Sequence, residues 1–493
     1  MLYRNQNILI FILILLLGLY LRLNNITFHS FWYDELFSVD FSHPSNTFQE
    51  TLKLTIEDVH PPFYQTILWI WLKIFGLNEF NARLLSVIIG IMTVIASYYL
   101  SKEFYNQKYS LVVAFLLSSN IFLVWYSQEA RSYQLTVLLS ILSYLYLYRT
   151  ILTENKKNLF LYWLVTIIWM YTHYFSFFII ASQFVFTFIY MIFFTNNKKQ
   201  LIKTIILTAL IFFISLLPLL PYILEISNSE KFSFLLEPSP LYFLTFIHFY
   251  FGYGGVFFVL IAFLLNLYFI LTTKINNKEK VFLLMLFSWV FFGYFILYLK
   301  SIFSFSLIQL RYTIVMIPPI ILLSVFGVSK LKKYLQMIIL FIVIIFSFKV
   351  LFFDYHDTYK QDHRNVLKYV SKYNSIPIYE LIPGNGHNGN NTNHYQVYAD
   401  MLNLDLKIID DTKFKKEILK DSLPSCFWVL YSFNSVDLDS QKDVFDFYKI
   451  NANKSLIAIH KEEYFKAEAS LISKNNNTEC KTLSILLNKD IPK

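Results

Sequence analysis

Residues 31–62 read FWYDELFSVDFSHPSNTFQETLKLTIEDVHPP and place a dense set of ionisable side chains between two strongly apolar segments. The set comprises Asp34, Glu35, Asp40, Glu57, Asp58 and His60, in a chain in which only 15% of the residues are charged. Ionisable groups next to a membrane are costly unless they are paired, hydrated or used. We therefore take this stretch as the centre around which the chain is organised.

The composition is that of an integral membrane protein. The 493 residues are 56% hydrophobic and 19% aromatic, with a mean hydropathy of +0.48, whereas soluble domains have an apolar share of about 45–50%. Phe and Tyr are abundant and Gly is scarce, which favours long, side-chain-packed helices. The net charge of +9 comes largely from loops between apolar segments, so it indicates the usual enrichment of Lys and Arg on the cytoplasmic side and no nucleic-acid partner.

The lysine-rich loops orient the apolar segments. Five loops are rich in Lys or Arg and are expected to be cytoplasmic: 102–108, 149–157, 198–203, 274–280 and 330–333. About eleven spans follow: 6–23, 83–101, 109–125, 132–149, 159–172, 175–195, 202–222, 253–272, 281–299, 312–328 and 335–353. The N-terminus is then cytoplasmic and the C-terminus is not.

Two N-terminal segments have alternative interpretations. The first apolar run could be a cleaved signal peptide, but no small-residue cleavage site follows it, so we expect a retained span with Arg22 snorkelling at its end. Residues 61–76 are short for a span of about 20 residues and carry Trp69, Trp71 and Lys73. We expect a juxtamembrane helix on the outer surface, and a short true span is the alternative.

Residues 354–493 are polar and rich in Asn, Lys and Asp, which predicts a small extracytoplasmic α/β domain after a membrane domain of residues 1–353 that includes the outer loop 24–82. Expected strands are 376–382, 427–433 and 455–460, and the apolar spacing of 363–373 predicts a helix. The histidines of the polar loop 384–394 are expected to be solvated. Cys426 and Cys480 either pair or leave Cys426 simply buried, and both possibilities stay open.

Several charged residues far apart in the chain fall at expected outer helix ends. Arg131, Arg311 and His173 share that side with the acidic stretch. Each one alone is explained by a pair such as Glu129 with Arg131, or by snorkelling, but their convergence indicates a site. Arginine binds phosphate through two parallel hydrogen bonds, and a nearby carboxylate can take a proton from an acceptor. This chemistry suits sugar transfer from a lipid phosphate.

The ordered motifs YDE, DVHPPFYQTILWIWLKIFGLNEFNARLLSVIIG, WYSQEARSYQL, YTHYFSFF and RYTIVMIPP resemble the membrane glycosyltransferases of the protein O-mannosyltransferase and aminoarabinose-transferase superfamily. They are most similar to the bacterial branch loosely called dolichyl-phosphate-mannose mannosyltransferase-like. The resemblance covers residues 30–372, including YKQDHRNVLKYV, and the last hundred or so residues show no family pattern. It implies a GT-C fold, an α-helical polytopic membrane protein in the cell membrane. It also implies an active site facing away from the cytoplasm and a polyprenyl-phosphate sugar donor.

The resemblance also implies roles for individual residues. Asp34 would be the base for the acceptor, and Glu35 would orient the acceptor or tune Asp34. The donor and its phosphate would be bound by Arg131, Arg311, His173, Tyr174 and Tyr312, and the site would be lined by Asp58, His60, Gln128 and Glu129. No cofactor is expected. The carboxylates could supply oxygen ligands to a divalent cation, but the resembled branch does not clearly require one.

Two other functions share these features. A transporter or flippase of lipid-linked sugars would use the charges as a pathway, but transporters place charges near the midplane and show internal repeats. Here the charges gather at one surface, no repeat is evident, and an outer domain is appended. A ligation enzyme with a pyrophosphate donor would share the clamp and the base but should show another motif order. The sequence leaves the sugar and the acceptor open.

Overall fold

The structure is a computed structural model, and its chain divides into two compact units. Unit 1 comprises residues 1–25, 55–67 and 83–356, and unit 2 comprises residues 26–54, 68–82 and 357–493. The structure describes residues 2–57, 60–228, 241–303, 306, 308–353, 360–373, 375–381, 394–410, 413–414, 416–417, 420, 422–432, 456–464, 467–474, 478 and 480–482. Of the predicted features, Asp58 and most of the polar loop 384–394 lie outside these residues.

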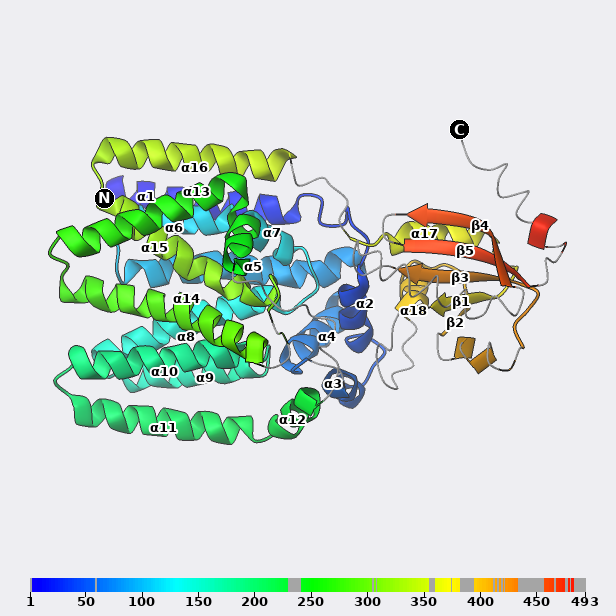
Figure 1. The fold of residues 1–493 in the computed structure, drawn as a ribbon, viewed down its shortest axis with the longest axis horizontal. Helices are drawn as coiled ribbons and strands as arrows, with labels where there is room; N and C mark the ends of the chain where they lie inside the picture. The colour runs from blue at the N-terminus through cyan, green and yellow to red at the C-terminus, as the bar shows by residue number, and fades with distance from the viewer. Residues whose placement is uncertain are drawn as a thin grey trace. The chain divides into compact units, whose positions relative to one another are not determined.

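Unit 1 is built from α-helices (Figure 1). Its helices are α1 (Leu2–Leu23), α6 (Gln107–Ser118), α7 (Ile121–Ser127), α8 (Tyr133–Thr153), α9 (Lys156–Met170), α10 (Ser176–Phe193), α11 (Lys198–Leu216), α12 (Leu220–Asn228), α13 (Tyr242–Thr272), α14 (Asn277–Phe303), the 3-10 helix η2 (Tyr312–Met316), α15 (Ile317–Ser329) and α16 (Lys333–Phe353). Helices α4 (Phe63–Phe75) and α5 (Glu79–Lys102) are divided between the two units. The predicted helical membrane fold is confirmed.

Eight of the described helices are long and apolar enough to cross a membrane, against about eleven predicted spans. The predicted span 109–125 consists of two helices, α6 and α7, bent by 57° at a short break, and the pair counts as a ninth candidate if it is one broken span. The predicted span 159–172 corresponds to α9, which has only 15 residues. Helix α16 (Lys333–Phe353) covers the predicted span 335–353. Hydropathy alone found these segments but could not show the break or the short helix.

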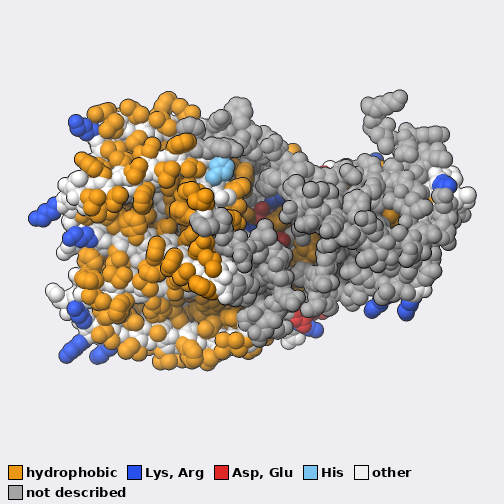
Figure 2. Space-filling view, in the orientation of Figure 1, with side chains coloured by type: hydrophobic (Ala, Val, Ile, Leu, Met, Phe, Trp, Pro, Cys, Tyr) orange, Lys and Arg blue, Asp and Glu red, His pale blue; other side chains and the backbone are white. Residues whose placement is uncertain are grey.

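Lys and Arg side chains lie along one end of unit 1 (Figure 2). Arg149 Nη2 lies 2.6 Å from Glu103 Oε1, and Lys330 pairs with Glu279. Lys108 Nζ donates to Gln336 Oε1 at 3.2 Å. Residues from different loops meet, so these connections share one side of the helices, as the charge pattern predicts.

Arg22 does not snorkel, because its side chain is fully buried. Its guanidinium donates to the carbonyl oxygens of Ser118 at 2.8 Å and Gly18 at 3.0 Å, and to Ser127 Oγ at 3.0 Å. The last carbonyls of a helix have no partner within that helix, and a cation stabilises that end. Arg22 therefore caps α6 at its break. A Cβ at Gly90 of α5 would lie 2.7 Å from Arg22 Nε, so only glycine leaves room there.

Unit 2 contains a five-stranded sheet with the order β2-β1-β3-β5-β4. Its strands are β1 (Ile378–Leu381), β2 (Ile408–Ile409), β3 (Cys426–Ser432), β4 (Leu456–Tyr464) and β5 (Ala467–Lys474). β1 pairs in parallel with β2 and β3, and β5 pairs antiparallel with β3 and β4. Helix α17 (His363–Val370) buries Val366, Leu367 and Val370 and contacts β3, β4 and β5. The predicted helix and three strands are confirmed, while β2, β5 and α18 (His394–Met401) were missed.

The acidic stretch belongs mainly to unit 2, whereas the predicted linear boundary at residue 354 placed it with the membrane domain. It forms α2 (Tyr33–Phe41) and α3 (Phe48–Glu57), although the last residues of α3 fall in unit 1. Helix α18 packs against α2, and buried Phe31 lies 5.6 Å from the Tyr398 ring. Hydropathy could not show this, because the contacts join residues more than 300 positions apart.

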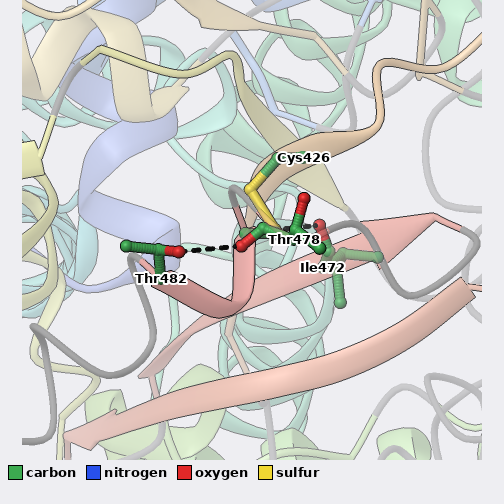
Figure 3. The surroundings of a disulfide bond; sticks show 5 residues. Cys426, Ile472, Thr478 and Thr482 are labelled. Carbon is green, nitrogen blue, oxygen red and sulfur yellow. Dashed lines mark hydrogen bonds between the residues drawn. A yellow bond between two sulfur atoms is a disulfide. The ribbon is translucent and has the colours of Figure 1, made fainter.

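Cys426 and Cys480 form a disulfide that closes a separation of 54 residues (Figure 3). Cys426 begins β3, and Cys480 lies 3.3 Å from the Ile472 carbonyl oxygen of β5. Both cysteines are buried. The two possibilities left open by the sequence are therefore both realised for Cys426, which is buried and paired.

Candidate active site

Arg131 and His60 meet in unit 1. Arg131 Nη2 lies 2.8 Å from His60 Nε2. A guanidinium can only donate hydrogen bonds, so His60 Nε2 is the acceptor of this bond. The backbone N–H of Phe63 at the start of α4 donates to the Tyr171 carbonyl at 2.9 Å. This bond ties the His60 segment to the connection between α9 and α10.

An aromatic cluster joins Arg131 to Arg311. The Arg131 guanidinium lies 5.7 Å from the Tyr133 ring centre, and the Arg311 guanidinium lies 5.6 Å from that of Tyr312. The His173 ring lies 6.0 Å from Tyr133 and 5.2 Å from Tyr312. Cations are attracted to the faces of aromatic rings. Five residues from three separate parts of the sequence thus form one cluster with a guanidinium at each end.

His173 is neutral in this cluster. Burial lowers the pKa of His173 to about 3, and nearby His60, Arg131 and Arg311 act in the same direction. Its Nδ1 accepts a hydrogen bond from the Phe175 backbone N–H at 3.1 Å, which leaves the ring proton on Nε2. The positive charge of the cluster therefore resides on the two arginines, and His173 offers a neutral N–H donor.

Local structure explains why these residues share one end of unit 1. Arg131 lies in the short turn between α7 and α8, His173 in the connection between α9 and α10, and Arg311 directly before η2. Each connection follows a helix that starts near the lysine-rich end, so an up-and-down bundle returns all three to the opposite end. The pattern of alternating loops predicts this gathering.

Other predicted site residues of unit 1 have mainly structural contacts. Gln128 is buried, and its Nε2 donates to the carbonyl oxygens of Asn24 at 2.8 Å and Arg22 at 3.0 Å, which joins α7 to the end of α1. Glu129 is buried, and its carbonyl accepts from the Arg131 N–H at 2.8 Å. Tyr174 is half-buried and stacks on Phe177. The roles assigned to these residues stay predictions.

Asp34 and Glu35 occupy the first turn of α2 in unit 2 and differ in exposure. Glu35 is fully buried, and its Oε2 lies 3.8 Å from Lys360 Nζ and 3.5 Å from the Trp32 backbone N–H that it caps. Asp34 is only half-buried. A carboxylate that takes a proton from a substrate must be reachable, so this difference favours Asp34 as the base and Glu35 as the residue that orients it. The convergence of Asp34 with Arg131 stays a prediction.

Two contributors were missed from the sequence. Tyr133 links Arg131 to His173, but it is one of 36 tyrosines, and only its place two residues after Arg131 could have singled it out. Lys360 pairs with Glu35 across 325 positions, which no local pattern reveals. Within the residues that the structure describes, no group of three or more His, Cys, Asp or Glu side chains is placed to hold a metal ion.

A cavity of about 280 Å³ opens beside the cluster in unit 1. It is lined mainly by apolar side chains of α6, α13, α15 and α16, with Ser119 and Asn120 of the α6–α7 break at its polar edge. Tyr250 lines it, and its hydroxyl donates to the Leu310 carbonyl and contacts Thr313. These two residues flank Arg311 and Tyr312, so the cavity lies next to one end of the cluster.

Comparisons with known proteins support the same fold. Residues 59–223 match the family described as dolichyl-phosphate-mannose-protein mannosyltransferase. No curated protein matches the chain. A structure of ArnT from Cupriavidus metallidurans bound to undecaprenyl phosphate is 10% identical, has a TM-score of 0.57, and matches over 94% of this chain and 97% of that chain. Its apo state is 11% identical, with a TM-score of 0.60 and coverages of 95% and 98%.

A third similar structure is the archaeal oligosaccharyltransferase AglB from Archaeoglobus fulgidus in complex with an inhibitory peptide and a dolichol-phosphate. It is 11% identical, has a TM-score of 0.53, and matches over 87% of this chain and 70% of that chain. Identities this low carry information about the fold alone.

Proposed function

We propose that the chain belongs to the GT-C superfamily of membrane glycosyltransferases and that it moves a sugar from a polyprenyl-phosphate donor to an extracytoplasmic acceptor. The family match over residues 59–223 and the fold shared with ArnT support this proposal. The observation that carries the proposal is the cluster in which Arg131 contacts His60 and in which Arg131 and Arg311 lie on either side of the neutral His173. Two fixed cations in a partly buried place fit a phosphate, since arginine binds it through paired hydrogen bonds.

In the proposed reaction, this cluster stabilises the leaving group, which is the polyprenyl phosphate. As the bond between the anomeric carbon and the phosphate oxygen breaks, negative charge develops on the polyprenyl phosphate, and positioned guanidinium groups stabilise it. His173 Nε2–H and the Tyr312 hydroxyl are further donors beside the same place. Because the phosphate leaves as an anion already neutralised by two cations, no separate acid is required to protonate it.

The acceptor side of the reaction is assigned to Asp34. Asp34 takes the proton as the acceptor oxygen or nitrogen bonds to the anomeric carbon from the face opposite the phosphate, which inverts the configuration. This assignment rests on the sequence resemblance and on the accessibility of Asp34 relative to Glu35. A carboxylate suits this task because it can accept one proton within hydrogen-bonding reach.

The cavity beside Tyr250 is the proposed place for the first isoprene units of the donor. Its lining is apolar, and Phe257 and Ile261 at its rim are among the exposed apolar side chains of α13. A lipid tail can therefore enter sideways from the bilayer while its phosphate reaches Arg311. We place the lysine-rich end of unit 1 in the cytoplasm, following the charge rule, so this chemistry takes place on the outer side. The disulfide of unit 2 fits an oxidising compartment.

The experiment uses purified protein in nanodiscs with a panel of radiolabelled polyprenyl-phosphate sugars and delipidated cell-envelope fractions as acceptors. We expect one donor to label one fraction. Arg131→Gln and Arg311→Gln should each lower kcat/KM by about 10²-fold, since loss of one charged donor to a developing anion has that size. Asp34→Asn should be folded and inactive.

The matched control is Arg149→Gln, which removes a guanidinium paired with Glu103 at the lysine-rich end. It should keep wild-type kcat/KM. Movement of a labelled donor across a vesicle membrane without any transfer product would contradict the proposal and favour the flippase alternative. Full activity of Arg131→Gln and Arg311→Gln would remove the phosphate clamp from the mechanism.

A further inference from the structure

We propose that Lys360 is a positioning residue that holds the acidic turn of α2 in its working geometry, through its ion pair with buried Glu35. The inference concerns contacts within unit 2 only. It rests on the proposed function, because it takes Asp34 as the base that the turn presents.

Residues 360–364, here called the strap, bind the chain that leads into α2. The Gln361 carbonyl accepts from Ser30 Oγ at 2.7 Å, and its side-chain oxygen accepts from the Tyr33 backbone N–H at 3.1 Å. His363 Nδ1 lies 2.9 Å from the Phe31 carbonyl and donates to it, because a carbonyl can only accept. Ser30, Phe31, Gln361 and His363 are all buried. The start of α2 is therefore fixed by hydrogen bonds in a dry environment.

The ion pair of Lys360 with Glu35 is the charged part of this contact. The two side chains are 5% and 0% exposed, and Lys360 Nζ also lies 6.0 Å from the Trp32 ring centre. Loss of one partner from a buried pair leaves an uncompensated charge, which is strongly unfavourable. Without Lys360, the buried carboxylate of Glu35 would lose the cation beside it, and a shift of this side chain would change the turn.

That movement would reach Asp34 directly. Asp34 and Glu35 are consecutive residues of one helical turn, so their side chains point about 100° apart around the helix. Burial of Glu35 beside Lys360 therefore fixes the rotation of the turn that also carries the half-buried Asp34. The direction of the proposed base is set by its neighbour, and the neighbour is held by Lys360.

The far end of the strap provides a matched control. Arg364 Nη1 lies 2.8 Å from Glu79 Oε2, and this guanidinium also donates to the Thr27 and Phe28 carbonyls. The Tyr398 hydroxyl also donates to Glu79, and it accepts a hydrogen bond from the Phe31 backbone N–H. Arg364→Met thus removes an ion pair of unit 2 that does not contact α2.

The test measures kcat, donor KM and thermal stability for Lys360→Met, Lys360→Arg, the double variant Lys360→Met/Glu35→Gln and the control Arg364→Met. Lys360→Met should lower kcat about 10²-fold, the size expected of a misplacement near 1 Å, with donor KM within about twofold. Lys360→Arg keeps the charge and should stay within about threefold of wild type. Arg364→Met should lose stability while its kcat stays within about threefold.

The double variant tests whether Lys360 acts through Glu35. Removing the charge of Glu35 as well should raise kcat about tenfold above that of Lys360→Met and leave it below wild type. The proposal would be overturned if the kcat of the double variant were no higher than that of Lys360→Met. A wild-type kcat in Lys360→Met or in the double variant would also overturn it. If Lys360→Met does not fold, the other two variants decide the question. The double variant should then have a kcat below that of wild type, and Lys360→Arg should keep a kcat close to that of wild type.

A thiol probe reports the turn itself. The only two cysteines of the chain are bonded to each other, so Ser38→Cys adds a single reactive thiol to a fully buried position of α2. Maleimide labelling of that thiol should be faster when Lys360→Met is added and unchanged when Arg364→Met is added. Full activity of Asp34→Asn would refute the proposed function and this inference together, whereas inactive Asp34→Asn with fully active Lys360→Met refutes the inference alone.

Discussion

Replacing His173 should make the folded protein less sensitive to acid. The ring is buried, and its pKa in the folded state is about 3, against an ordinary value of 6.5. Between these values the unfolded chain binds a proton at this position and the folded chain does not. Stability therefore rises with pH across this window, and it falls as the pH is lowered below 6.5.

The size of the effect follows from the two pKa values. Each unit of pH below 6.5 favours the protonated, unfolded chain by about 1.4 kcal/mol, until the folded state also protonates near pH 3. At pH 5.0, about 1.5 units below the ordinary value, His173 should reduce the free energy of unfolding by about 2 kcal/mol relative to pH 7.5. His173→Gln keeps a side-chain oxygen that can accept the Phe175 N–H bond and has no titrating ring.

The assay follows unfolding by SDS titration in dodecyl maltoside micelles at pH 7.5 and 5.0, monitored by tryptophan fluorescence. Wild type should lose about 2 kcal/mol more than His173→Gln between the two pH values. The control is His43→Gln, which removes a histidine of unit 2 that contacts Ser45 and should keep the wild-type loss. Equal losses for wild type and His173→Gln would refute the account of His173 as a buried, neutral ring.

Four further outcomes are expected. Arg22→Met should lower the free energy of unfolding by about 3 kcal/mol, because charged hydrogen bonds to the α6 carbonyls are lost; thermal melts in detergent measure this, and an unchanged melting temperature would exclude the capping role. Replacing Cys426 and Cys480 by Ala should destabilise unit 2 by about 4 kcal/mol, the loop-closure value for a separation of 54 residues, and non-reducing peptide mapping of wild type should recover the linked pair. Ile339→Trp should fill the cavity and raise the KM for a long-chain donor about tenfold, while the KM for a short-chain donor stays constant. Equal changes in KM for both donors would argue against the tail site. Transfer activity should survive EDTA within about twofold, since guanidinium groups supply the positive charge; restoration by added Mg²⁺ after loss in EDTA would contradict this.

Much of the fold could be predicted because it depends on local pattern. Apolar runs and lysine-rich loops located the helices of unit 1, and the apolar spacing of Val366, Leu367 and Val370 located α17. The gathering of Arg131, His173 and Arg311 at one end could also be predicted, since alternating loops of an up-and-down bundle return to the same side. These features follow from the burial of apolar surface, which a chain displays residue by residue.

Details of the same segments depended on tertiary contacts. The bend between α6 and α7 and the shortness of α9 leave the hydropathy of their segments unchanged. Arg22 stands at the end of an apolar run, where a snorkelling side chain is the ordinary expectation, and only the approach of α6 at its break provides the carbonyl groups that bury it. The sequence alone does not show which groups will bind a cationic side chain, so it cannot show whether that side chain is buried or exposed.

The sequence by itself determined that the chain is a helical membrane protein, where its polar C-terminal region begins, and that Arg131, His173 and Arg311 share one end of unit 1. Only the tertiary structure decided that the acidic stretch packs in unit 2, that Glu35 is buried against Lys360 while Asp34 is not, and that the cysteines pair. The physical reason is the separation along the chain over which each interaction acts. Hydrophobic periodicity acts over a few residues, whereas an ion pair between residues 35 and 360 forms only after packing has closed the intervening chain.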